Sequence, residues 1–462
     1  MTLTRTPETG PDGARRPVPG SGPYPPVITG TRVLTGPAGT PPALHLAVSD
    51  LADPGPARPW QADRQAFGTS WNVPEQARRS AEGEAVERFC GSVPPAPARV
   101  HYGTHDDLTR RGVPALDPRR LVLYSPRQYA TPGFPFRPFL RDSPAHWIEG
   151  RSADGDEPVL VPAFLVYTAW RRMPHEHPEP RYAFPALGGT AAGPTLGHAL
   201  RSALEEVVER DAAAVWWANA RPLPALPPTP YLRTLISGAP RDFDIRLTYL
   251  ENEFGAPVIA AGVRSREEGW LTYGFALRHD PVEAAAKALA EAYTLHVTCR
   301  TLENPTATVR TPGRPSPLKP WRRDRRYLDS YRDDSSDVVE QLCQQQLYLD
   351  RRAADRVAPW TWTRPDALWS DVPALPRDDP GALLDRVRAE GYEVISVDIT
   401  APQAAASGVH TVRAVVPGTT TTAPAAYPFL GADRLRKAAD RLGWSRSPLP
   451  GKELNAFPMP HS

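Results

Sequence analysis

Two separate segments of the chain carry the same polar residues at the same spacing. Residues 80–88 and 202–210 both read Ser-x-x-x-Glu-x-x-Glu-Arg. An α-helix turns once in about 3.6 residues, so offsets 0, 4, 7 and 8 of this pattern fall on one helical face. The pattern therefore predicts two helices that each present a hydroxyl, two carboxylates and a guanidinium along a single stripe.

Carboxylates one helical turn apart repel each other unless a cation lies among them. Four carboxylates from two facing helices would form an oxygen-rich site suited to Mg²⁺, which usually binds alongside the phosphates of a substrate. These carboxylates belong to Glu84, Glu87, Glu206 and Glu209. Arg88 and Arg210 would pair with the phosphate oxygens. A single copy of the pattern would fit a surface helix with ordinary charge pairs, but its repetition favours a magnesium–nucleotide site.

The surrounding sequence predicts the elements that position these helices. The first helix is expected at about 74–90, with Pro74 at its first position. A glycine-rich turn at 188–195 precedes the second helix, where free backbone N–H groups favour an anion. A third helix at 281–300 has an apolar stripe and places Glu291 as the counterpart of the other glutamates.

Apolar runs between these helices predict the strands. They are expected at 43–48, 65–72, 119–124, 158–167, 243–250, 258–263, 270–276, 393–399 and 411–416. Three rounds of strands, turn and helix predict a triplicated core of the α/β (α+β) class, with repeated strand–helix units around the magnesium–nucleotide site.

Composition excludes several classes of protein. The 462 residues carry a net charge of +2 with Lys and Arg dispersed, which argues against a nucleic-acid surface or a polybasic membrane patch. No apolar run reaches the roughly 20 residues of a membrane span, and the N-terminus lacks an apolar signal segment. Cys90, Cys299 and Cys343 lie far apart, so neither a disulfide framework nor a zinc site is expected. These features predict a soluble cytoplasmic protein.

The distribution of proline and glycine suggests the domain organisation. Residues 1–60 form a Pro/Gly-rich N-terminal segment, with disorder expected up to about residue 30. Residues 61–462 form the main domain. Within it, a charged connector is expected at about 301–375 with a helix near 337–354, followed by a short helix at 381–390. A proline-containing tail runs from 448 to 462 and includes Pro458 and Pro460.

Other polar groups give weaker site patterns than the two acidic stripes. The run His175-Glu176-His177 could bind a metal, but prolines on both sides favour an exposed loop. His101 and His105, with Asp106 and Asp107, give a similarly weak metal pattern. Cys90 follows the first acidic helix without a partner His at useful spacing, so a buried thiol is expected. Trp216 and Trp217 are expected in the core.

Taken together, the doubled acidic pattern and the glycine-rich turn before its second copy resemble the YcaO family. The segments 274–281 and 391–400, with Val415-Val416-Pro417-Gly418, extend the resemblance from about residue 65 to the C-terminus. The resemblance implies an ATP-dependent, peptide-modifying enzyme. In this family a Cys, Ser or Thr side chain adds to the preceding backbone amide, and ATP phosphorylates the resulting oxyanion. Phosphate then leaves as a thiazoline or oxazoline ring forms.

The resemblance also implies roles for individual residues. Glu84, Glu87, Glu206 and Glu209 would hold Mg²⁺ and ATP, with Glu291 as a further nucleotide-binding candidate. Ser80, Ser202, Arg88 and Arg210 would support the phosphates. In many azoline-forming members a Pro-x-Pro-x-Pro tail reaches the active site, which implies a catalytic role for Pro460.

The implied partners are a precursor peptide, made of a leader and a Cys/Ser/Thr-rich core, and a separate protein that binds the leader. The leader-binding protein would be ubiquitin-activating-enzyme-like or a recognition-element protein. It is expected to be a separate chain, because residues 1–60 are too short and too Pro-rich to form a leader-binding domain. The resemblance leaves a homodimer open.

Several positions depart from the family pattern. Gly188 stands where Asn is common, His198 where an acid is frequent, and Thr69 where Lys is frequent, while Pro458-Met459-Pro460 is a shortened proline tail. Two alternatives therefore stay open beside the cyclodehydratase: a non-catalytic scaffold subunit of a peptide-modifying complex, and a thioamide-forming relative. The sequence does not name the peptide or the preferred nucleophile.

Overall fold

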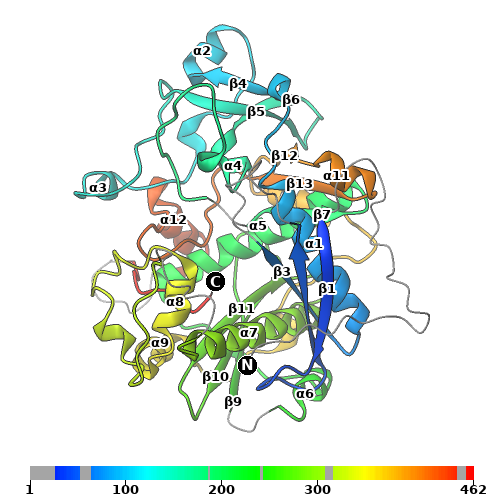
Figure 1. Cartoon of the computed structure of the whole chain (residues 1–462), viewed down its shortest axis with the longest axis vertical. Coiled ribbons are helices and arrows are strands. Elements are labelled where there is room, and N and C mark those ends of the chain that lie inside the picture. Colours follow the sequence, from blue (N-terminus) through cyan, green and yellow to red (C-terminus); the bar gives the residue numbers. More distant parts are fainter. Residues whose placement is uncertain are drawn as a thin grey trace.

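The fold was obtained as a computed structural model, which describes residues 27–52, 64–185, 188–239, 243–306, 316–444 and 454–461. The disorder expected near the N-terminus falls outside the described residues up to residue 26, as does the start of the tail at 448–453. Three antiparallel sheets are present in the described part, with long helices packed on them (Figure 1).

The first sheet carries the first acidic helix. Its order is β1 (Ile28–Thr35), β2 (Leu44–Leu51) and β3 (Gln65–Trp71), so it spans the domain boundary expected near residue 60. Helix α1 (Pro74–Cys90) follows β3 and packs directly on it. A Cβ atom at Gly68 would lie 2.1 Å from the backbone nitrogen of Ala81, so only glycine allows this close approach.

The second sheet repeats this arrangement with the third helix. Its order is β11 (Leu271–Leu277), β10 (Val258–Ser265), β9 (Phe243–Tyr249) and β8 (Ala225–Leu226). Helix α7 (Pro281–Glu303) packs on β11 and β10 and begins at Asp280, whose side chain accepts from the N–H groups of Val282 and Glu283. A Cβ atom at Gly274 would lie 2.1 Å from the carbonyl oxygen of Ala288.

The third sheet holds the second acidic helix. Its order is β4 (Val100–Gly103), β5 (Ala145–Ser152), β12 (Ile395–Asp398), β13 (His410–Val415) and β7 (Thr190–Gly193), and β6 (Pro158–Pro162) pairs with β5. Helix α5 (Leu196–Asn219) follows β7 and packs on β7 and β13. The upper part of this layer also contains α2 (His105–Arg110), α3 (Pro126–Tyr129) and α4 (Ala163–Val166) (Figure 1).

The remaining helices lie around α5 and the second sheet, except α11 (Pro402–Ala406), which packs on β13 of the third sheet (Figure 1). They are α6 (Pro230–Ile236), α8 (Gln341–Leu347), α9 (Arg351–Thr361), α10 (Ala382–Ala389), α11 and α12 (Arg434–Arg441). Short 3₁₀ turns lie at Pro97–Arg99, Pro118–Arg120, Trp170–Arg172, Tyr327–Asp329, Trp369–Asp371 and Gly431–Asp433.

Some of the expected elements differ from the structure. The strand expected at 119–124 is wrong, because a 3₁₀ turn occupies Pro118–Arg120 and the next residues join no sheet. In the run 158–167, predicted as a strand broken by Pro162, the break is confirmed, but the residues after it form helix α4 instead of strand. The glycine-rich turn expected at 188–195 is largely strand, because Thr190–Gly193 forms β7 and pairs with β13. The single helix expected near 337–354 is two helices, α8 and α9, because Asp350 lies between them and its side chain caps α9 at Arg352 N–H.

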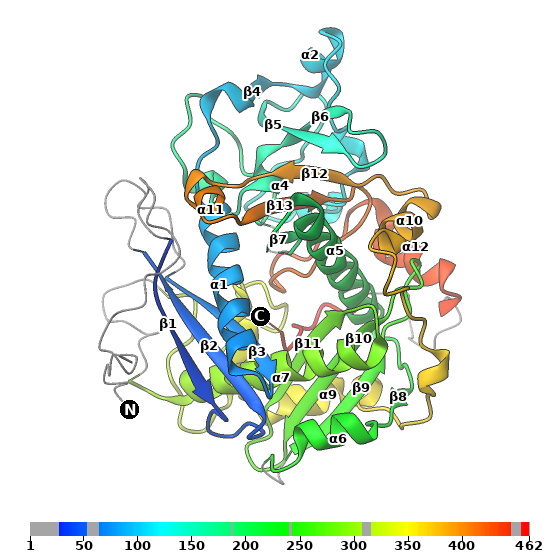
Figure 2. The same ribbon diagram turned by 90° about the vertical axis from the view of Figure 1, so that its right-hand side faces the viewer.

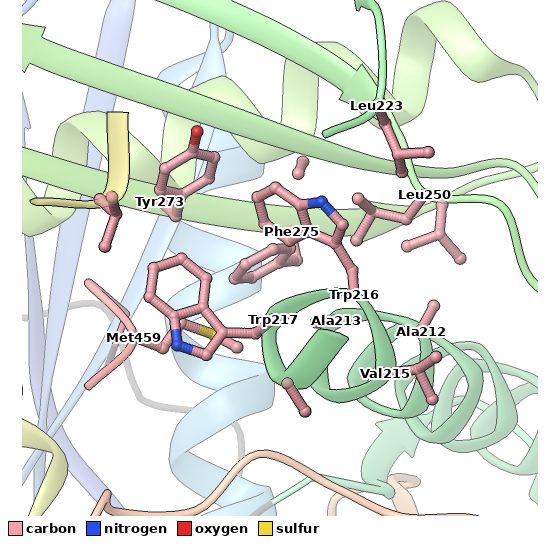
Figure 3. Close-up of a cluster of buried hydrophobic side chains, with 14 of the residues drawn as sticks. Ala212, Ala213, Val215, Trp216, Trp217, Leu223, Leu250, Tyr273, Phe275 and Met459 are labelled. Carbon is pink, nitrogen blue, oxygen red and sulfur yellow. The ribbon is translucent and has the colours of Figure 1, made fainter. Parts of the chain in front are cut away.

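The core under α5 is aromatic and includes the end of the chain. Trp216 and Trp217 are buried and pack against Tyr273, with ring centroids 5.6 and 6.5 Å apart (Figure 3). Met459, from the C-terminal tail, lies in the same cluster (Figure 3). The expected core role of the two tryptophans is confirmed.

The three cysteines form no disulfide among the described residues. Cys90, Cys299 and Cys343 are free and buried. Within the described ranges, no helix is both long and apolar enough to cross a membrane.

Candidate active site

The two acidic helices meet at the strand that precedes the second of them. From α1, Glu87 accepts a hydrogen bond at its Oε1 from the backbone N–H of Ala192 in β7, at 2.8 Å. From α5, Glu206 accepts at its Oε2 from the backbone N–H of Gly189, also at 2.8 Å. Both carboxylates are thus fixed by backbone donors of the segment 189–192, which brings the two stripes together.

The carboxyl groups of this cluster are short of compensating positive charge. Burial raises the pKa of Glu87 well above its usual range, and the nearby Glu84 carboxylate adds to the effect. Burial also raises the pKa of Glu206. The pKa of Glu209 is raised to about 8 by burial, against the attraction of Arg210, with Glu291 and Glu206 raising it further. A divalent cation at this place would relieve the repulsion.

Arg210 is the central cation of the cluster. Its side chain is 17% exposed and lies 3.6 Å from Glu206 (Nη2 to Oε1) and 3.6 Å from Glu209 (Nε to Oε1). Burial alone would lower the pKa of Arg210, but the Glu209 and Glu206 carboxylates outweigh it and raise the pKa. The equivalent Arg88 is 38% exposed and pairs with Glu84 at 2.6 Å. The two copies of the pattern are therefore not equivalent in space.

The third helix contributes Glu291, as the sequence pattern predicted. Its Oε1 lies 3.0 Å from Nζ of Lys287, one turn earlier on α7. Burial raises the pKa of Glu291, but Lys287 and Arg210 outweigh burial and hold this pKa below its usual value. Glu291 is therefore ionised and completes a cluster drawn from three helices.

The C-terminal tail ends in the same place. In Figure 2 the mark for the C-terminus lies near α5 and β11, the elements that His461 contacts through Arg210 and Tyr273. The carbonyl of Pro460 accepts from Tyr273 N–H at 2.8 Å, and that of Pro458 accepts from the Tyr348 hydroxyl at 2.7 Å. Trp217 donates its indole N–H to the Phe457 carbonyl at 2.6 Å. The proline-containing tail is thus docked through its backbone carbonyls.

His461, which the sequence pattern did not single out, is the tail residue that contacts Arg210. A guanidinium N–H of Arg210 donates to Nε2 of His461, and Nδ1 of His461 lies 2.9 Å from the carbonyl oxygen of Tyr273. Burial, together with the neighbouring Arg210, lowers the pKa of His461 to about 3, so the ring is neutral with its proton on Nδ1. Only the three-dimensional path of the tail places this imidazole here.

The two predicted serines lie on the acidic helices, and His198 and Gly188, which depart from the family pattern, lie near the second of these helices. Ser80 and Ser202 lie one turn before the glutamates and are half-buried. His198 is exposed in the first turn of α5, where its backbone N–H donates to Thr195 Oγ1 at 3.1 Å. A Cβ atom at Gly188 would lie 2.9 Å from Cγ of Arg210, so a larger residue here would press on the cluster.

The histidines and the cysteine that were weaker candidates for a site have ordinary hydrogen-bonded or buried surroundings. His175 is tied to the Trp170 carbonyl at 2.6 Å through Nε2, and His105 accepts from Arg141 Nε at 3.1 Å. Burial raises the pKa of Cys90, which favours the thiol and fits the expected buried residue. Among the described residues, no three His, Cys, Asp or Glu side chains form a ready metal cage. The cluster fits a Mg²⁺ ion that takes most of its ligands from phosphates and water.

The raised pKa of Glu209 predicts a pH dependence of stability. In the unfolded chain this carboxyl loses its proton near its ordinary pKa, whereas the folded protein retains the proton up to about pH 8. The folded state thus binds more protons across this interval, so stability falls as pH rises through it. The thermal midpoint of the nucleotide-free protein should drop from about pH 6 to about pH 9. A Glu209→Gln variant should drop less, and parallel curves would contradict the assignment.

The fold and the cluster define a mixed α/β protein with an acidic site suited to a magnesium–nucleotide complex. The chain belongs to the YcaO family, because the sequence model described as YcaO cyclodehydratase, ATP- and Mg²⁺-binding, matches residues 72–420. The predicted family and fold class are confirmed. No curated protein matches the chain.

Solved structures share this fold. A heterocyclase in complex with substrate and cofactor is 23% identical with a TM-score of 0.70, over 94% of this chain and 55% of that one. The YcaO protein of Methanopyrus kandleri, bound with AMPPCP and Mg²⁺, is 21% identical with a TM-score of 0.52, over 85% and 86%. The E. coli microcin synthetase McbBCD complex with pro-MccB17 bound is 12% identical with a TM-score of 0.50, over 84% and 88%. The chain spans about half the length of the first of these proteins.

Proposed function

We propose that the chain is an ATP-dependent cyclodehydratase that acts on a peptide backbone. A Cys, Ser or Thr side chain loses its proton and bonds to the carbonyl carbon of the preceding amide, and the carbonyl π electrons move to oxygen. That oxygen takes the γ-phosphoryl group of ATP and ADP leaves. The amide nitrogen then loses its proton and forms a C=N bond as inorganic phosphate departs. The original amide oxygen leaves within that phosphate.

One observation carries the proposal: two Glu-x-x-Glu-Arg helices converge on a buried acidic cluster at which the chain also ends. In the proposal Mg²⁺ and ATP are held by Glu84, Glu87, Glu206 and Glu209, with Glu291, Ser80 and Ser202 beside them. Bound Mg²⁺ would neutralise charge on the transferring phosphoryl group. A cluster of carboxyls with raised pKa values suits this task, because binding of the cation compensates their ionisation.

The arginines and the tail have separate parts in the proposal. Arg210 donates to phosphate oxygens from its buried place between Glu206 and Glu209. Arg88, which is more exposed, would contact the nucleotide from the other helix. Pro460 docks the tail on Tyr273, and His461 fixes the direction of the Arg210 guanidinium as a neutral acceptor.

The proposal includes a precursor peptide and a partner. We expect a separate leader-binding protein to deliver the precursor. The E. coli microcin synthetase McbBCD complex, which shares this fold and holds pro-MccB17, supports a complex of this kind. The leader-binding protein, a homodimer and a cytoplasmic location are parts of the proposal that purification of the native complex would test.

The test is calorimetric binding of ATP with Mg²⁺ to the full-length protein. Glu87→Gln and Glu209→Gln should each weaken binding by about 100-fold or more, because each removes a charge that faces the cation. Glu82→Gln is the matched control, since Glu82 lies on the same helix as Glu87 but pairs with Arg78. It should bind as the wild type does.

The outcomes separate the hypotheses. Wild-type affinity in both Glu87→Gln and Glu209→Gln would remove the site from this cluster. No binding to the wild type, even with the leader-binding partner present, would favour the non-catalytic scaffold. If binding is present, analysis of the peptide product for a ring or a thioamide distinguishes the cyclodehydratase from its thioamide-forming relative.

A further inference from the structure

A cavity adjoins the acidic cluster on the side of β13, in the third sheet. It lies between residues 121–123, residues 183–184, β13 and the loop that follows β13, and its volume is about 90 Å³. The wall includes Leu123, Leu165, Phe184, Val207 and Phe429, so it is mostly apolar. This lining is that of a site for an organic group rather than for a bare anion.

One charged side chain lies in this apolar wall. Arg413, from β13, is 4% exposed and lines the cavity. Its Nη1 donates to Thr190 Oγ1 at 3.1 Å, while its Nε–H has no acceptor in the described part of the chain. No carboxylate among the described residues forms an ion pair with Arg413. Burial lowers the pKa of Arg413 to about 10, although the Glu206 carboxylate acts to raise it, so the side chain stays charged at neutral pH. A buried guanidinium that uses only part of its hydrogen-bonding capacity favours a ligand oxygen.

The cavity is continuous with the place where phosphoryl transfer would occur. Gly188 lines the cavity, and a Cβ atom there would lie 2.9 Å from Arg210 Cγ and 3.4 Å from the carboxyl carbon of Glu206. Among the described residues, the nearest side chains to Gly188 at this end of the cavity are therefore those of Arg210 and Glu206. A group held by Arg413 would be next to Arg210 and Glu206.

We propose that this cavity binds the peptide segment that is modified, an inference that rests on the proposed function. The guanidinium of Arg413 donates to the oxygen of the amide to be phosphorylated. That oxygen belongs to the residue before the Cys, Ser or Thr, so the side chain of this preceding residue lies in the apolar wall. The cavity thus selects peptides with an apolar residue directly before the cyclised one. The apolar lining disfavours the other oxygen-bearing ligand, the triphosphate of ATP.

The test uses two short peptides, acetyl-leucyl-serine amide and acetyl-aspartyl-serine amide, titrated into the nucleotide-free full-length protein by NMR. The leucyl peptide should bind the wild type at least about 10-fold more tightly than the aspartyl peptide. Arg413→Lys keeps the charge but loses the guanidinium, and should weaken binding of the leucyl peptide about 10-fold. Leu165→Trp fills the cavity and should also weaken binding of the leucyl peptide about 10-fold. Arg151→Lys is the control, because Arg151 lies on the same sheet with its side chain 52% exposed.

Each result decides the inference. Equal binding of the leucyl peptide to wild type, Arg413→Lys and Leu165→Trp overturns it, and so does an absence of binding to the wild type. Loss of Mg²⁺–ATP affinity in Arg413→Lys with unchanged peptide binding assigns the arginine to the nucleotide instead. Because the peptide titrations contain no nucleotide, a wild type that binds peptide but not ATP contradicts the proposed function alone.

Discussion

Replacing Arg210 by Met is expected to slow ATP turnover by about 10³-fold, the magnitude typical for loss of an arginine that contacts a transferring phosphoryl group. Arg210 is enclosed by Glu206 and Glu209 and oriented by His461. Its loss removes a guanidinium that touches all three of these groups. Single-turnover measurement of ADP formation, with precursor peptide and partner present, gives the rate of the chemical step.

The matched comparison is Arg88→Met. The two arginines occupy the same place in the repeated pattern, but the Arg88 side chain is 38% exposed and that of Arg210 17%. An exposed ion pair contributes little, so Arg88→Met should slow turnover by less than about 10-fold. Equal losses in the two variants would mean that the helices act as true equivalents. Unchanged turnover in Arg210→Met would remove Arg210 from the phosphoryl site.

Much of the site could be predicted because it depends on local periodicity. Pro74 and the one-sided acidic stripe define a helix over 74–90, which is the observed extent of α1. Glu291 was found in the same way, from the apolar stripe of its helix. Residues that act through the helical repeat are visible in the sequence, since the repeat fixes which side chains share a face.

Other features depend on contacts between distant parts of the chain. Strand β12 pairs with β5, so that Ile395 lies opposite Ser152, and no local pattern encodes this register. The run Val122-Leu123-Tyr124 has strand composition but packs in an aromatic cluster, where the ring of Tyr124 stacks on Phe136 at 4.7 Å. His461 reaches Arg210 across 251 positions of the sequence. Composition alone cannot predict where such a chain end lies.

A buried ion-pair network holds α5 in place beside the cluster. Asp211 follows Arg210 directly and accepts from Arg434 Nε at 3.1 Å and from Thr420 N–H at 2.7 Å. Arg434 also donates to Glu253, and to the Tyr392 hydroxyl at 2.8 Å. The side chains of Arg434, Asp211 and Glu253 are 4%, 2% and 3% exposed. One guanidinium therefore compensates two buried carboxylates and joins α5 to α12.

Replacing Arg434 by Met is expected to lower the free energy of unfolding by about 3–5 kcal/mol, because Asp211 is left buried without its cation and Glu253 keeps only its pair with the exposed Arg441. Arg436→Met is the control on the same helix; Arg436 is exposed, so a change within about 0.5 kcal/mol is expected. Urea denaturation monitored by tryptophan fluorescence measures both. Adding Asp211→Asn to Arg434→Met should recover part of the loss, since it removes the unpaired charge. If Arg434→Met and Arg436→Met unfold at the same urea concentration, the network does not stabilise the fold, and α5 is held by its aromatic core alone.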